Sequence, residues 1–488
     1  MAPKRRAWRR LLAGGFLAAW LAVAWWQTHK SLPPGTHVAT PACTVPTAGL
    51  AFIADVTTAD AFGRPVVSQG IFDAVLGLIA HAHRLIVLDY GAFAGAAKQE
   101  APQRRVAAAL TDALLTRWRE QPDLAILVIT DPVNDGYGAS QSENLQLLRA
   151  AGVEVVTTDL NRLRDPNVAW SSLWRLALRW WDHPSAPLGI ETRRLNFKTS
   201  DRRLIIADEP AGTIAAIVGS ANPSDRESAW SNVAVRVTGA PVEALLESEL
   251  QIARFSGWHG RAEAYAAGAP GVPRECTTAA ASSAGMPEQG ARVQLLTEGA
   301  IGSALLARLD ATSAPDSVDA ALEYMADRGV IEALLAAARR GVRVRLILDP
   351  NEGAAHGGVA GVPNQPVASE LLSRSGGSIH VRWYRTHGER FHPALVLVYG
   401  PRSLWLAAGS AQLTRRDLED YNLEADAAIE FSREAPFARQ ALEYFDSLWA
   451  NRASPGIEYT ADFAVYADPA QSDYWLYRLM EASGLSAF

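Results

Sequence analysis

Two stretches of the chain share one layout: residues 201–222 read DRRLIIADEPAGTIAAIVGSAN, and residues 392–412 read HPALVLVYGPRSLWLAAGSAQ. Each has a polar start, an apolar run, a turn with proline and glycine, a second apolar run, and then Gly-Ser-Ala followed by an amide. Two apolar runs joined by such a turn are typical of a β-hairpin. The sequence therefore predicts the same hairpin in each half of the chain.

The segments before the two hairpins match in the same order. The matched pairs are residues 83–90 with 317–325, 106–120 with 330–341, 124–134 with 342–351, and 147–160 with 371–384. Apolar strands that alternate with amphipathic helices indicate α/β layers, with helices on both faces of a sheet. We therefore expect an internal duplication. In one matched pair, both apolar runs end in Asp-Pro, at Asp131 and Asp349. Proline cannot continue a central ladder, so we expect the strands to end there, with both acids capping the turns that follow.

Two loose, Pro-rich stretches divide the chain. We expect a basic stub and transmembrane anchor at residues 1–30, a tether at 31–48, a first repeat at 49–262, a linker at 263–290, a second repeat at 291–452 and a C-terminal extension at 453–488.

The composition is that of a globular protein with an acidic body. Of the 488 residues, 49% are apolar and 20% are charged, so wholesale disorder is excluded. The net charge is −6, but residues 1–30 hold six bases and no acid, so the rest carries 40 bases against 52 acids. A body with net charge −12 is poorly suited to bind nucleic acid, and we expect no such partner.

The N-terminal segment predicts a membrane anchor. Residues 11–26, LLAGGFLAAWLAVAWW, carry no charge and follow five bases. We expect a single-pass anchor in the inner (cytoplasmic) membrane, with the body on the periplasmic or extracytoplasmic side. The alternative is a cleaved signal peptide, supported by small Ala22 and Ala24 but opposed by the bulky Trp25 that follows. In an oxidising space Cys43 and Cys276 could pair, which the sequence leaves open.

A tryptophan-rich segment at residues 170–181, WSSLWRLALRWW, also has a helical pattern. At 100° per residue Trp170, Trp174 and Trp181 share one face. This face could lie at a lipid interface, or it could pack against the sheet or the other lobe.

The duplicated hairpins resemble the phospholipase D superfamily, whose members carry H-x-K-x4-D twice, each followed by Gly-(Gly or Ser)-x-Asn. The resemblance runs from about Leu50 to about Trp449. It implies two pseudo-symmetric α/β/α lobes with one shared site, phosphodiester substrates, and no metal or other cofactor. It also implies that one histidine attacks phosphorus, that the other protonates the leaving oxygen, and that lysines and asparagines hold the phosphoryl oxygens.

The first motif departs from that pattern. Asp201 stands at the histidine position, Arg203 at lysine and Asp208 at aspartate. A different register would place Asn196, Lys198 and Arg203 at these positions, again without a histidine. A carboxylate at the position of Asp201 repels an anionic phosphate.

The second motif keeps its histidine, His392, but has Ala394 and Tyr399 in place of lysine and aspartate. If the protein is active, His392 is the nucleophile. The residues expected to contact phosphate are Arg203, Ser220, Asn222, Ser410 and Gln412.

Each of these residues also has a structural interpretation. Arg203 could instead form a salt bridge with Asp201 or Asp208, and Ser220 and Asn222 could stabilise turns. His392 could have no chemical role. His387 is a weak candidate for a replacement catalyst in a nearby loop.

The sequence therefore predicts a membrane-anchored phospholipase D-like protein with lost or weak catalysis, which binds phospholipid or another phosphodiester between the repeats. One alternative is an active phospholipase or phosphatidyltransferase that uses His392. The other is a membrane-tethered scaffold that binds a protein partner.

Overall fold

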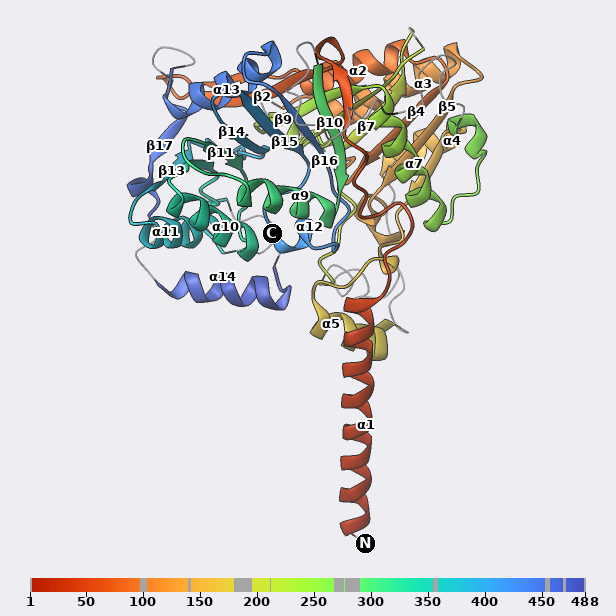
Figure 1. Cartoon of the computed structure of the whole chain (residues 1–488). Helices are drawn as coiled ribbons and strands as arrows, with labels where there is room; N and C mark the ends of the chain where they lie inside the picture. Colours follow the sequence, from red (N-terminus) through yellow and green to blue (C-terminus); the bar gives the residue numbers. More distant parts are fainter. Residues whose placement is uncertain are drawn as a thin grey trace.

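The computed structural model describes residues 2–96, 103–138, 142–179, 195–210, 212–266, 276, 290–353, 359–452, 457–467 and 471–486. Figure 1 shows two α/β lobes side by side and one long helix that projects from them. The expected fold class, two α/β lobes with an N-terminal apolar helix, is confirmed.

The first lobe is built on a mixed sheet with the strand order β3-β2-β9-β8-β7-β4-β5-β6. Its strands are β2 (Ala51–Ala59), β3 (Pro65–Ser68), β4 (Leu85–Tyr90), β5 (Ala125–Thr130), β6 (Glu154–Thr157), β7 (Leu204–Asp208), β8 (Ile214–Gly219) and β9 (Asn232–Thr238). Its helices include α2 (Ile71–His81), α3 (Val106–Glu120), α4 (Glu143–Ala151), α5 (Val168–Leu173), α7 (Ala240–Phe255) and α8 (Ala262–Ala266).

The second lobe has the strand order β1-β10-β16-β15-β14-β11-β12-β13-β17. Its strands are β1 (Cys43–Pro46), β10 (Gly290–Thr297), β11 (Ser317–Leu322), β12 (Arg343–Leu348), β13 (Ile379–Tyr384), β14 (Ala394–Tyr399), β15 (Ser403–Gly409), β16 (Ala425–Ser432) and β17 (Thr460–Asp462). Its helices include α9 (Gly299–Asp310), α10 (Arg328–Arg339), α11 (Asn364–Arg374), α12 (Arg415–Leu418), α13 (Pro436–Trp449) and α14 (Gln471–Ser483).

The two sheets repeat one topology. The run β2-β9-β8-β7-β4-β5-β6 corresponds strand for strand with β10-β16-β15-β14-β11-β12-β13. In each run the last three strands are parallel and the others are antiparallel. The predicted hairpins are β7–β8 and β14–β15, and the predicted helices before the Asp-Pro strands are α3 and α10. The internal duplication is therefore present in the fold.

The inner faces of the two sheets share one hydrophobic core. Leu204 and Ile206 of β7 belong to the same buried cluster as Leu395 and Leu397 of β14, together with residues of α7 and α13. Ile205, between the first two, faces the opposite side and packs with α2 and α3. Because both faces of these strands are buried, their sequences are continuous apolar runs and do not alternate between apolar and polar residues.

A buried ion cluster also ties the lobes together. Arg202 is fully buried and bonds Glu249 of α7 at 2.7 Å and Glu298, which follows β10, at 2.7 Å. The Arg202 guanidinium is thereby paired with two carboxylates inside the protein, as a buried charge requires.

The segments outside the repeats take part in the second sheet. Residues Cys43–Pro46, expected to belong to a tether, form β1 and pair with β10. A disulfide joins Cys43 to Cys276, so the two cysteines are paired. In the C-terminal part, β17 adds to the other edge beside β13. Edge strands offer unpaired backbone groups, which explains why short terminal strands add there.

The N-terminal helix α1 (Ala2–His29) leaves the body along its own axis, and residues Trp8–His29 are long and apolar enough to cross a membrane. The tryptophan-rich segment packs against α1: α5 contacts it, and Trp20 Nε1 donates to Ala169 O at 3.0 Å. A π-helical turn (Trp174–Leu178) follows α5, with Trp174 buried. The segment thus contacts α1, a partner that neither sequence interpretation named, while Trp180 and Trp181 lie outside the described residues.

Candidate functional site

The two hairpin motifs begin at the boundary between the lobes. The backbone N–H of Asp201 donates to Leu423 O at 2.9 Å, and that of His392 donates to Ser231 O at 2.9 Å. Each motif in one lobe is therefore hydrogen-bonded to the other lobe at the matching point. The internal pseudo-symmetry brings Asp201 and His392 to one place.

The two strand-ending acids hold these motif starts. Asp131 accepts from Ser200 N at 2.8 Å, and Asp349 accepts from Phe391 N at 2.8 Å, so each acid contacts the residue before its motif. Each also accepts from a backbone N–H two residues further on, which confirms the expected turn capping. Burial raises the pKa of both acids to about 7.

The ring of His392 is buried and enclosed by polar groups. Its Nδ1 lies 2.9 Å from Asn232 Oδ1, and its Nε2 lies 3.0 Å from Glu323 Oε2 and 3.3 Å from Arg203 Nη1. The Trp230 ring covers one side, with the ring centroids 5.2 Å apart. The Nε2 atom, which a nucleophile would use, therefore faces a carboxylate and a guanidinium.

The carboxylate of Glu323 is the strongest charge partner of this histidine. It is 4% exposed and also bonds Arg390 Nη1 at 2.7 Å. Burial alone would raise the pKa of Glu323, but the charge and hydrogen bond of His392 and the guanidinium of Arg390 outweigh it and lower the pKa to about 2. Glu323 is therefore anionic at neutral pH.

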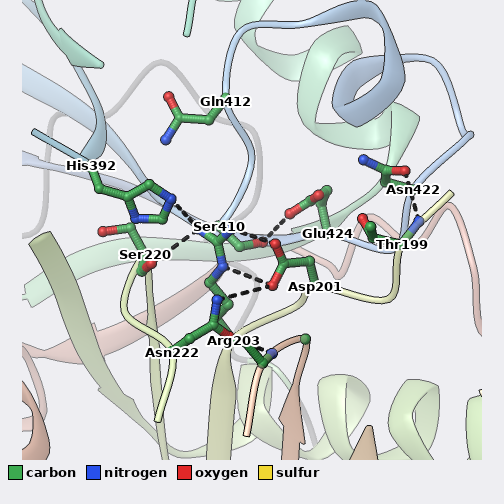
Figure 2. Close-up of polar contacts among 12 residues, drawn as sticks. Thr199, Asp201, Arg203, Ser220, Asn222, His392, Ser410, Gln412, Asn422 and Glu424 are labelled. Carbon is green, nitrogen blue, oxygen red and sulfur yellow. Dashed lines mark hydrogen bonds and ion pairs between the residues drawn. The ribbon is translucent and has the colours of Figure 1, made fainter. Parts of the chain in front are cut away.

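Arg203 lies between the two motif starts, as Figure 2 shows. Its Nε donates to Asp201 Oδ1 at 2.8 Å and its Nη2 donates to Asp201 Oδ2, while its Nη1 donates to Ser220 O at 3.0 Å. The expected salt bridge with Asp201 is thus present. All three guanidinium nitrogens are engaged by protein groups, and the side chain is 9% exposed. Positive φ at Arg203 (47°) turns its backbone into this position.

The geometry favours the first sequence register for this motif. Asp208, at the end of β7, accepts from the backbone N–H groups of Arg84 and Leu85, each at 2.9 Å, and so joins the start of β4. It lies at the opposite end of the strand from Asp201. Lys198, the lysine of the other register, bonds Asp165 at 2.7 Å near the base of α1.

The amides at the motif ends bind backbone. Asn222 Oδ1 accepts from Ala92 N at 3.1 Å, and Gln412 Oε1 accepts from Glu323 N at 3.0 Å. Gln412 also donates to Pro393 O at 3.1 Å. Both amides therefore stabilise the loops after β4 and β11, and Asn222 Nδ2 in addition donates to Asp201 Oδ1 at 3.5 Å.

The two motif serines contact matching residues of the following strands. Ser220 Oγ donates to Asn232 Oδ1 at 2.9 Å, and Ser410 Oγ donates to a Glu424 oxygen. Burial raises the pKa of Glu424 well above its ordinary value, and the neighbouring Asp417 adds to this effect.

A further acid, the half-buried Glu227, lies close enough to interact electrostatically with His392 and Arg203. Burial raises its pKa, although the two cations oppose this shift. Together with Asp201, Glu323 and Glu424, it makes the centre between the lobes rich in carboxyl groups. A phosphoryl group is normally stabilised by cations and N–H donors, so this centre differs from a phosphate cradle.

A cleft of about 460 Å³ opens beside this centre. Its walls include Trp230, Arg390 and the exposed Arg226. The Arg390 guanidinium lies 5.0 Å from the centre of the Trp230 ring. The same tryptophan ring also contacts the His392 ring. His387 lines the same cleft and lies 3.6 Å from Glu389, so it faces the cleft and not the buried pair.

Among the residues that the structure describes, no group of three or more His, Cys, Asp or Glu is arranged to hold a metal ion.

The sequence analysis did not identify four residues of this site, namely Glu323, Asn232, Trp230 and Arg390. Glu323 stands in the matched run 317–325, where it follows the strand directly, and such strand ends often carry site residues. Its pairing with His392, 69 positions away, has no local signal. Arg390 lies two positions before His392, and this spacing alone gives no sign that Arg390 contacts Glu323.

Residues 305–449 match a family model described as "Cardiolipin synthase, PLD-like domain". No curated protein matches the chain.

One solved structure superposes on most of the chain. The crystal structure of phosphatidylserine synthase from Haemophilus influenzae superposes with a TM-score of 0.52 at 12% identity, over 90% of this chain and 94% of that one. Polyphosphate kinase from Porphyromonas gingivalis (TM-score 0.43, 13% identity, 85% of this chain and 52% of that one) and the phospholipase D family member Nuc from Salmonella typhimurium (TM-score 0.26, 20% identity, 33% and 95%) are more distant. Residues 305–449 of the second lobe thus match a phospholipase D-like domain, and the chain as a whole shares the fold of the phosphatidylserine synthase structure.

Proposed function

We propose that this chain is a membrane-anchored phospholipase D-like protein that binds a phosphodiester, namely a phospholipid head group, at the cleft between its lobes and has lost the two-histidine reaction. We place it in the inner membrane with its body on the periplasmic side. The apolar helix α1 with its basic flank and the Cys43–Cys276 disulfide support this location.

The observation that carries the proposal is the Asp201–Arg203 pair at the position that pseudo-symmetry gives to the second catalytic group. Both Asp201 oxygens accept hydrogen bonds from Arg203, so this carboxyl group is engaged by a protein side chain where the second histidine would stand. The Arg203 guanidinium, which would otherwise hold a phosphoryl oxygen, is engaged by Asp201 in this pair. When members of a catalytic unit are lost, most of the rate acceleration is lost with them.

The surviving histidine is also restrained. His392 Nε2 faces the Glu323 carboxylate at 3.0 Å and the Arg203 guanidinium at 3.3 Å, so both groups stand where phosphorus would have to approach this atom. The carboxylate would in addition repel the incoming phosphodiester.

Binding remains chemically reasonable at the mouth of the site. The cleft has the size of a small-molecule pocket, about 300–1,000 Å³. Arg226 offers an exposed cation for a phosphate, and the Trp230 side chain offers an apolar surface.

A single-turnover phosphoryl trapping experiment tests the loss of catalysis. The full chain in detergent micelles is mixed with labelled phospholipid or a generic phosphodiester, and acid-labile, base-stable label on His392 is sought. We expect no label. Label that is absent from His392→Ala would show an active enzyme and overturn this part of the proposal.

Equilibrium binding of a short-chain phospholipid tests the other part. We expect saturable binding that Arg226→Ala weakens by about tenfold or more, the effect of one charge-assisted hydrogen bond. The matched control is Arg119→Ala, another exposed arginine, on α3, which should bind like the original protein. Absence of saturable binding to the folded protein would leave the scaffold interpretation.

A further inference from the structure

The C-terminal helix α14 has two distinct faces. On the inner face, Tyr477 is fully buried and its hydroxyl donates to Glu370 of α11 at 2.8 Å. Glu481, one turn further on, accepts from Arg415 N at 2.8 Å. These contacts fix the rotation of the helix on the second lobe.

The outer face of α14 is apolar and uncovered. Trp475 is 68% exposed and Leu479 is 65% exposed, and residues four apart share one face of a helix. Leu485, just past the helix, is 51% exposed. Scattered exposed apolar residues are ordinary, but a contiguous apolar face marks an interaction surface.

The position of α14 indicates what covers this face. Figure 1 shows α14 on the side of the body from which α1 projects, lying across the direction of α1 and level with the point where α1 joins the body. If α1 spans a bilayer, that point is the membrane surface, and a helix lying in this plane has the orientation of an interfacial helix.

The chemistry of the helix fits the same partner. Tryptophan is preferred at the membrane–water boundary because its ring is apolar and its N–H is polar. The carboxylate of Glu481 points into the protein, while Arg478 is half-buried beside the apolar face. An arginine at the edge of such a face can extend its charge to lipid phosphates.

We propose that α14 is a second membrane contact, which inserts Trp475, Leu479 and Leu485 into the outer leaflet of the bilayer that α1 crosses. This proposal rests on the anchoring role of α1 in the proposed function. With two contacts, one at each lobe, the body is held in a fixed orientation on the lipid surface.

The test uses the full chain in vesicles of phosphatidylcholine and phosphatidylglycerol. Both native cysteines are in the disulfide, so a single introduced cysteine can be labelled with an environment-sensitive fluorophore. Leu479→Cys reports on α14. The matched control is Leu147→Cys on α4 of the first lobe, a leucine that is also exposed (49%).

We expect a blue-shifted emission at position 479 and quenching by lipids with a nitroxide in the acyl chain, about threefold or more stronger than at position 147. Equal, weak quenching at both positions overturns the proposal. A blue shift at 479 without lipid quenching means that a protein covers this face, and overturns it as well. Vesicle flotation of the same samples reports separately on α1: protein that does not float contradicts the anchor, whereas floating protein without quenching at 479 contradicts α14 alone.

Discussion

Replacing Glu323 by glutamine tests the buried pair at the centre of the site. The pKa of this carboxyl group falls from its ordinary value of 4.5 to about 2. Each tenfold change in proton affinity corresponds to about 1.4 kcal/mol, so its surroundings stabilise the charged form by about 3 kcal/mol. Breaking a buried ion pair by removing one partner costs a similar amount, about 3–5 kcal/mol. We therefore expect Glu323→Gln to lower the free energy of unfolding by about 3 kcal/mol at pH 7.

The sign of the pH dependence follows from the same shift. A group with a lowered folded-state pKa stabilises the protein above its unfolded value and loses this effect as the pH falls towards the folded value. The difference between the original protein and Glu323→Gln should therefore shrink as the pH falls below about 4.5. Urea unfolding of the full chain in detergent, followed by circular dichroism, measures both quantities.

The matched control is Glu332→Gln, which removes a carboxylate that bonds Arg374 on the surface and is 47% exposed. An exposed pair contributes at most about 1 kcal/mol, so this variant should unfold nearly like the original protein. If Glu323→Gln is no more destabilising than the control, the reasoning on the buried pair is refuted. A cycle with His392→Gln provides a second check, because independent effects of the two substitutions would show that Glu323 and His392 are not coupled.

Three further outcomes follow from other parts of the fold. Arg202→Met should lower the free energy of urea unfolding by about 3–5 kcal/mol, because it leaves buried carboxylates unpaired; a change below about 1 kcal/mol would contradict this. Burial raises the pKa of Asp349 to about 7 from an ordinary 3.8, so stability should decline as the pH rises from about 4 to about 7. Asp349→Asn should flatten that decline, and an unchanged pH profile of unfolding would contradict it. Reduction of the Cys43–Cys276 disulfide should lower the stability by about 2–5 kcal/mol, and a urea midpoint unaffected by dithiothreitol would argue against a stabilising bond.

The contrast between site and scaffold is visible in the motif residues themselves. Asp208 and Gln412 bind backbone N–H groups of neighbouring loops, which is a structural role that does not depend on catalysis. Asn222 binds such a group too, but it also contacts Asp201. Their positions can be retained after the reaction is lost, because the loops still need hydrogen-bond partners. Asp201 and Arg203, in contrast, bond mainly to each other and fill the place where a substrate group would be held.

The architecture could be predicted from local patterns in the chain. The repeated order of apolar runs, helical patterns and Pro/Gly turns predicted the two matching sheets, since periodicity and turn residues act locally. The long apolar segment before residue 30 predicted α1 in the same way. The Asp-Pro pairs predicted the ends of β5 and β12 because proline terminates a ladder wherever it occurs.

Which side chains meet at the centre of the site depends on how the two lobes pack together. That Glu323 faces His392 and that Cys43 meets Cys276 are contacts between residues from distant parts of the chain. The Arg203–Asp201 salt bridge joins residues two positions apart, and the sequence had already offered it as one interpretation. The tryptophan-rich segment found its partner in α1, at the far end of the chain. Local sequence patterns specify which face of an element is apolar, but they contain no information on which polar groups converge once the faces pack. The architecture was therefore readable from the chain, and the chemistry at its centre became visible only when the two lobes were together.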